Sequence, residues 1–265
     1  MKSWFLTKKT LMPLALILAL TTCLGIVSAA PSSVNVDFSR WNYGETYSQS
    51  MANTDFGAVN WLIGGSRLFV SGENDRHLRI TYPPGQIGSQ NSGGSFKAQL
   101  DPGTEYTAEY RVKFDSGFQW VKGGKLPGIC GGECNTGGDV PDGKGFSTRM
   151  MWRANGELVA YVYHLDQSGT YGEDISTGFS APAGSWVTIK LRVKLNTANN
   201  NNGILEVWIN GTRKINRTNL RYMNDSTKKI DTFYFSTFYG GSTSDFAPSS
   251  TNYARFDNFS IQKVN

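Results

Sequence analysis

The segment Tyr106–Phe114 reads YTAEYRVKF, and the segment Trp186–Leu195 reads WVTIKLRVKL. Every second residue from Tyr106 to Phe114 is apolar, and the same period of two recurs from Ile189 to Leu195. In an extended strand this spacing puts all apolar side chains on one face. The pattern predicts two half-buried strands whose apolar faces contribute to the core of a β-sheet protein.

The rest of the chain supports an all-β class. It contains 30 glycines and 13% aromatic residues, and no long stretch shows helical periodicity. Ten strands divided by turn residues predict a two-sheet antiparallel β-sandwich of jelly-roll type. The predicted strands are 68–71, 77–82, 95–100, 106–114, 146–153, 158–165, 186–195, 204–210, 232–238 and 253–264.

The first thirty residues predict a secretory signal peptide. Lysines at positions 2, 8 and 9 precede an apolar run from Leu11 to Val27, which ends in small residues. Cys23 leaves lipidation open as a less favoured alternative, because Thr22 fits a lipid-modification site poorly. We therefore expect a secreted protein, with residues 31–265 forming one domain that has no membrane anchor after signal removal.

Cys130 and Cys134 are the cysteines that remain after the signal segment. In an oxidising compartment, this close spacing predicts a local disulfide. A metal site is disfavoured because the histidines, His77 and His164, lie far from the pair in sequence. We expect neither a metal nor a cofactor.

The formal net charge of +5 favours a polyanionic partner, and for an exported protein an acidic polysaccharide is a better expectation than nucleic acid. The basic residues are not clustered in one block, so the charge alone is a weak argument. We expect a monomer.

The segment from Phe146 to Leu165 predicts a hairpin around Ala154-Asn155-Gly156. A three-residue loop with Gly156 at positive φ would pair Arg149 with Tyr161 and Ser147 with Tyr163, all on one sheet face. A two-residue loop would shift the register and separate them. The first arrangement puts an apolar set on the opposite face, which favours it: Phe146, Met150, Trp152, Val162 and His164.

Two further features mark this region. The Gly-rich run Gly123–Gly128 contains Lys125, and the segment between Cys130 and Gly145 is long enough to border a cleft. His164 points away from the face that carries the tyrosines, so we expect a buried structural histidine. Arg–Tyr pairs also occur on exposed sheets without any catalytic role, and spacing alone does not decide between the two interpretations.

These motifs resemble polysaccharide lyase family 14, which contains alginate and glucuronan lyases. The resemblance is carried by Gly124–Gly128, the Cys130–Cys134 loop, Phe146–Arg153, Tyr161–Tyr163, Tyr234–Gly241 and Arg255–Asn258. It implies a β-jelly roll that cleaves a uronate polymer by β-elimination. It also implies a site formed by Lys125, Ser147, Arg149, Tyr161 and Tyr163. We further predict that Arg153 and Tyr239 bind substrate.

The residue types suit this chemistry. Elimination requires a cation at the uronate carboxylate and a group that removes the C5 proton. Arg149 can bind a carboxylate bidentately, Lys125 adds a second charge, and nearby cations would favour a tyrosine phenolate. We expect Tyr163 to act as base or acid, Tyr161 to bind or shuttle, and Ser147 to orient the sugar, with Lys125 as an alternative base.

The sequence leaves two other function classes open. A non-catalytic carbohydrate-binding module or lectin is the main alternative, because β-sandwiches with aromatic surfaces bind sugars without chemistry. A glycoside hydrolase is disfavoured, because the adjacent acids Glu173 and Asp174 would point to opposite faces of a strand. The identity of the uronate and the choice between endo and exo action stay open.

Overall fold

The computed structural model describes Met1 and residues 29–264. Most of the predicted signal segment, including Cys23, lies outside the described residues. No helix in this described part of the chain is both long and apolar enough to cross a membrane.

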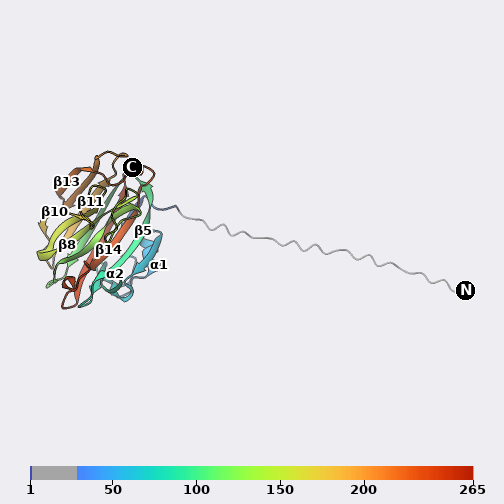
Figure 1. Cartoon of the computed structure of the whole chain (residues 1–265). Coiled ribbons are helices and arrows are strands. Elements are labelled where there is room, and N and C mark those ends of the chain that lie inside the picture. The colour runs from blue at the N-terminus through green and yellow to red at the C-terminus, as the bar shows by residue number, and fades with distance from the viewer. Residues whose placement is uncertain (2–28, 265) are drawn as a thin grey trace.

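Two antiparallel sheets form the molecule, and Figure 1 shows them as stacked layers of strands. In the first sheet the order is β13-β12-β11-β6-β15-β4-β3, and β1 also pairs with β15. Its strands are β1 (Ser33–Val36), β3 (Leu68–Ser71), β4 (His77–Tyr82), β6 (Glu105–Phe114), β11 (Trp186–Lys194), β12 (Gly203–Ile209), β13 (Thr212–Leu220) and β15 (Asn252–Lys263). We call it sheet A.

The second sheet, sheet B, has the order β10-β9-β8-β7-β14-β5-β2. Its strands are β2 (Val59–Ile63), β5 (Gly94–Gly103), β7 (Gly123–Gly132), β8 (Gly145–Arg153), β9 (Glu157–Tyr163), β10 (Glu173–Ser180) and β14 (Ile230–Tyr239). Short helices complete the fold: α1 (Gln49–Phe56), α2 (Gly88–Asn91) and the 3₁₀ turns Gly65–Arg67, Ala154–Gly156 and Ser244–Phe246.

The core lies between the sheets, as the period-two patterns predict. On β6, every second residue from Tyr106 to Phe114 is fully buried, while the residues between them are half-exposed on the outer face. The same alternation on β11 buries Ile189, Leu191 and Val193. The predicted all-β sandwich is confirmed.

All ten predicted strands are present, with shifts of one to three residues at some ends. The predicted strands do not include β1, β2, β7, β10 and β13 of the described residues, and the most important of these is β7. Its Gly-rich sequence predicts a strand edge around Lys125, whereas it is a full strand that pairs with both β8 and β14 in the middle of sheet B. Helix α1 was also not predicted; Ser48 caps its N-terminus and it packs beside β2 and β5 at one edge (Figure 1).

Candidate active site

The hairpin β8–β9 has the predicted register. Ser147 pairs with Tyr163 and Arg149 with Tyr161, around the three-residue turn Ala154–Gly156 in which Gly156 has φ of 78°. These four side chains share the outer face of sheet B. The two tyrosines pack in a small cluster separate from the inter-sheet core. They can therefore belong to a site on the outer face of the sheet.

Lys125 reaches the same face from β7 because this strand contains a bulge. Lys125 pairs with Met151, but Gly128 already pairs with Arg149, so β7 has one extra residue between them. Pro127 lies in this bulge, where its lack of a backbone N–H breaks no ladder hydrogen bond. Gly128 permits the close approach to β8, since a Cβ there would lie 2.1 Å from the carbonyl oxygen of Thr148.

The ammonium group of Lys125 lies in an unusual environment. Its Nζ is 2.9 Å from the Met151 Sδ atom and 3.6 Å from the centre of the Tyr161 ring. Burial lowers the pKa of Lys125 well below its ordinary value, and the nearby charges of Arg149 and Arg153 lower it further. Lys125 can therefore lose its proton at a pH where an exposed lysine keeps it.

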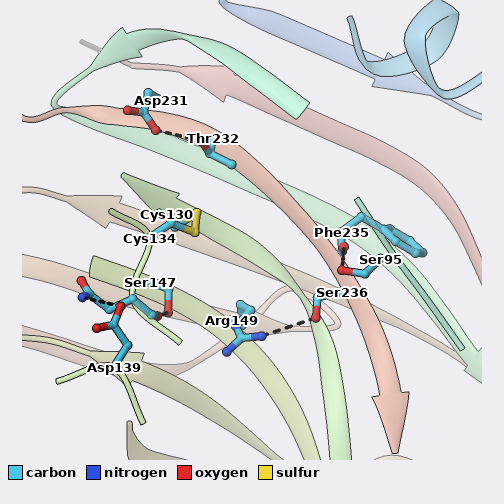
Figure 2. Close-up of a disulfide and its surroundings, with 11 residues drawn as sticks. Ser95, Cys130, Cys134, Asp139, Ser147, Arg149, Asp231, Thr232, Phe235 and Ser236 are labelled. Carbon is cyan, nitrogen blue, oxygen red and sulfur yellow. Dashed lines mark hydrogen bonds between the residues drawn. A yellow bond between two sulfur atoms is a disulfide. The ribbon is translucent and has the colours of Figure 1, made fainter. Parts of the chain in front are cut away.

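Arg149 is a buried cation with no carboxylate beside it among the described residues. Only 2% of the residue is exposed, and its Nη1 donates a 3.4 Å hydrogen bond to Ser236 Oγ on β14 (Figure 2). The guanidinium also lies 5.0 Å from the Tyr234 ring, and its Nε has no hydrogen-bond partner in this part of the chain. A buried, unneutralised guanidinium that borders open space is suited to bind an anion from solution.

Arg153 also borders the site, but its charge is already paired. It holds Asp174 of β10 bidentately, with distances of 2.8 Å from Nε to Oδ2 and 2.6 Å from Nη2 to Oδ1. Its guanidinium lies 5.7 Å from the Tyr161 ring. A direct contact between Arg153 and substrate stays a prediction.

Tyr163 and Ser147 lie under the loop that follows β7. The Gly138 N–H donates to Tyr163 Oη at 3.1 Å, and Tyr161 Oη lies 3.4 Å from the same oxygen. Ser147 is fully buried, and its Oγ donates to the Asn135 carbonyl oxygen at 2.7 Å. The expectation that Ser147 orients the sugar is therefore corrected: its hydroxyl is already used to hold the loop.

Two further expectations need correction. Tyr239 was expected to bind substrate, but it is fully buried between the sheets against Trp152 and donates its hydroxyl to the Gln119 carbonyl. Tyr239 follows Phe233 and Phe235 at two-residue spacing, so the alternation of β14 places it on the same inward face as those core residues. The cations were also expected to favour a tyrosine phenolate, yet the pKa of Tyr161 is raised, because burial and the Tyr163 hydroxyl outweigh Arg149.

A cleft of about 780 Å³ lies on this face. It brings together Lys125, Arg149, Arg153 and Tyr161, whereas Ser147 and Tyr163 do not line it. Sequence analysis missed several of its lining residues, which come from strands and loops distant in sequence: Tyr171, Asp174, Tyr234, Phe238 and Phe246. The only available signal was the resemblance of Tyr234–Gly241 to the family.

Cys130 and Cys134 form the predicted disulfide. Figure 2 shows it on the sheet that carries Ser147 and Arg149. It closes the first turn of the loop that follows β7. His164 is buried on the other face, as expected, and its Nε2 lies 2.7 Å from Glu173 Oε2.

We expect replacement of both cysteines by serine to lower the free energy of unfolding by about 2 kcal/mol, because the bridge closes only a short loop. Turnover should also fall, since the loop holds the Tyr163 hydroxyl through Gly138. Urea unfolding and initial rates measure the two effects. Wild-type protein treated with a thiol reductant provides a second sample without the disulfide. If both this sample and the double serine variant keep the wild-type rate, the loop does not position the Tyr163 hydroxyl for turnover.

The fold and the cleft together define a carbohydrate-active β-sandwich with cations placed for an acidic polymer. The family model for polysaccharide lyase 14 matches residues 71–259. The chain therefore belongs to polysaccharide lyase family 14, and it is a lyase that acts on polysaccharides rather than a non-catalytic sugar-binding module.

Solved structures agree with this assignment. Alginate lyase Aly36B is 32% identical, with a TM-score of 0.81, and the match covers 89% of this chain and 99% of that one. The marine alginate lyase of Aplysia kurodai is 24% identical over 89% of this chain and 100% of that one, with a TM-score of 0.76. The glucuronan lyase of Trichoderma reesei shares the fold at 14% identity over 89% and 96%, with a TM-score of 0.52. No curated protein sequence matches the chain significantly.

Proposed function

We propose that this chain is an exported alginate lyase that uses Lys125 as the base. The observation that carries the proposal is the position of a buried guanidinium, Arg149, beside the half-buried amine of Lys125 at one cleft. Arg149 has no described carboxylate to neutralise it, and Lys125 has a pKa lowered well below its ordinary value by burial. The Arg149 guanidinium is thus free to hold a uronate carboxylate, and the neutral Lys125 amine can accept a proton.

The steps of β-elimination follow from these positions. Arg149 neutralises the substrate carboxylate, which makes the C5 proton more acidic. The neutral Lys125 amine takes that proton, the electron pair of the C5–H bond forms the C4–C5 double bond, and the C4–O4 bond breaks. The departing O4 receives a proton from the Tyr161 hydroxyl, which lines the cleft, and Tyr161 takes the proton of the linked Tyr163 hydroxyl in its place.

The protonation states suit this division of roles. A raised pKa keeps the Tyr161 hydroxyl protonated, and a lowered pKa makes the Lys125 amine available as a base. The Gly138 N–H points at Tyr163 Oη and would stabilise a phenolate after proton donation. This arrangement favours Lys125 over Tyr163 as the base.

Alginate is supported over glucuronan by the solved relatives. Aly36B has been solved with alginate tri- and tetrasaccharides, in variants with a lysine and either a methionine or a tyrosine replaced by alanine. The same three residue types meet here as Lys125, Met151 and the tyrosine pair. Export is supported by the N-terminal pattern and by the disulfide.

A substrate panel tests the proposal. We expect the purified protein to release unsaturated uronate ends from alginate, seen as rising absorbance near ~235 nm, faster than from glucuronan. Mannuronate-rich and guluronate-rich blocks would then define the preferred uronate, and product lengths would separate endo from exo action. Cleavage of glucuronan alone would overturn the alginate assignment, and no product from any uronate polymer would overturn the proposed reaction.

A further inference from the structure

The outer face of sheet A, on the opposite side of the sandwich from the cleft, carries cations and aromatic rings in one row. Phe69, Arg79, Arg255, Lys113 and Trp186 are direct neighbours across β3, β4, β15, β6 and β11. All five side chains are half-exposed. Because neighbouring strands lie about 4.8 Å apart, the row spans about 19 Å, long enough for several linked sugar rings.

The cations of this row are incompletely neutralised. Lys113 makes no ion pair with any carboxylate in the described part of the chain, and Arg79 has only ring contacts, 5.5 Å from Phe69 and 5.0 Å from Tyr253. Arg255 pairs with Asp115. The row therefore has more positive than negative charge. These cations lie outside the catalytic cleft, so the proposed reaction does not use them.

A hollow of about 490 Å³ opens at the Trp186 end of the row. His77 lines it, and although 91% of this residue is buried (9% exposed), its Nε2 has no hydrogen-bond partner among the described residues. The other ring nitrogen, Nδ1, lies 2.8 Å from the Asp75 carbonyl oxygen and so acts as the donor, which leaves Nε2 as an unused acceptor. Burial of such an acceptor costs free energy unless a ligand or a water molecule donates a hydrogen bond to it.

The walls of the hollow suit a sugar. Trp186 borders it with its aromatic ring, over which the Arg111 guanidinium also lies at 4.6 Å, while Lys113, Arg255, Asp75 and Asp115 supply charged donors and acceptors around it. Sugars are bound by this combination of an aromatic surface for the apolar ring face and polar groups for the hydroxyls. The adjacent row of cations adds a preference for a chain that carries carboxylates.

We propose that the outer face of sheet A is a second, non-catalytic binding site for an acidic polysaccharide chain, centred on Lys113, Trp186 and His77. The choice of a uronate polymer as its ligand rests on the proposed function. Two sites on opposite faces of one molecule would hold a long polymer more tightly than the cleft alone, but would not affect a short oligosaccharide that occupies only the cleft.

Binding measurements on the full chain test this inference. In a Lys125→Met background, which should not cut the polymer, we expect Lys113→Gln and Trp186→Ala each to weaken binding of polymeric alginate at least about fivefold. With Lys125 intact, both variants should turn over alginate tetrasaccharide at the wild-type rate. Lys113→Gln changes only a half-exposed surface side chain, so it keeps the test valid if Trp186→Ala impairs folding.

Lys190→Gln is the matched control. It removes one positive charge from the same sheet face, but Lys190 lies outside the hollow and pairs with Glu109 at 3.7 Å. Equal polymer binding by the Lys113 and Lys190 variants would overturn the second site even if the wild-type protein cleaves alginate. Conversely, if no uronate polymer is cleaved but Lys113→Gln still selectively loses polymer binding, the proposed reaction fails and the second site stands.

Discussion

Replacement of Lys125 by methionine is expected to reduce turnover of alginate by ~10² to 10⁴-fold, because it removes the base while keeping most of the side-chain volume. Initial rates at saturating substrate measure this loss. Lys122→Met is the matched control: this neighbouring lysine is exposed, pairs with Asp245 and does not line the cleft. Wild-type turnover by the Lys125 variant would contradict the assignment of the base.

The pH dependence provides an independent check on the same residue. Only the neutral amine can accept the C5 proton, so the wild-type rate should fall as the pH drops through the lowered pKa of Lys125. The unfolded chain has the ordinary lysine pKa and binds more protons than the folded chain between the two pKa values, so stability rises with pH in that window. The methionine variant should lose this contribution and be at least as stable as wild type at neutral pH.

Tyr163→Phe is expected to lower turnover by ~10² to 10⁴-fold, because it removes the hydroxyl that relays a proton through Tyr161 to O4. Loss of the hydrogen bond from Gly138 should cost only about 1 kcal/mol of stability, so the variant should fold. Rates measured beside an unfolding curve separate the two effects.

Tyr161→Phe is a second test of proton donation, and Tyr106→Phe is the control for loss of a buried tyrosine hydroxyl. Tyr161 shares the hydroxyl contact with Tyr163 and lines the cleft, so its variant should also lose activity. Tyr106 is a core residue whose hydroxyl donates to the Asp101 carbonyl, and Tyr106→Phe should keep wild-type turnover. If Tyr163→Phe stays fully active while Tyr161→Phe does not, proton donation by the linked pair is wrong and Tyr161 alone is the donor.

The sequence by itself determined the sheet class and the face on which the reactive residues lie. Period-two alternation in β6 and β11 is a local property of the chain, and it identified the inward side chains correctly. The three-residue turn at Gly156 likewise set the register of the β8–β9 hairpin, because pairing across a tight turn depends only on neighbouring residues.

Only the tertiary structure decided how that face is used. Sequence gave no sign that β7 is a central strand or that its bulge brings Lys125 beside Met151 and Tyr161, since a Gly-rich strand has no apolar period. It also could not show that Ser147 supports a loop. Burial, the lowered pKa of Lys125 and the unneutralised charge of Arg149 arise from contacts between strands distant in sequence, and no local pattern contains them.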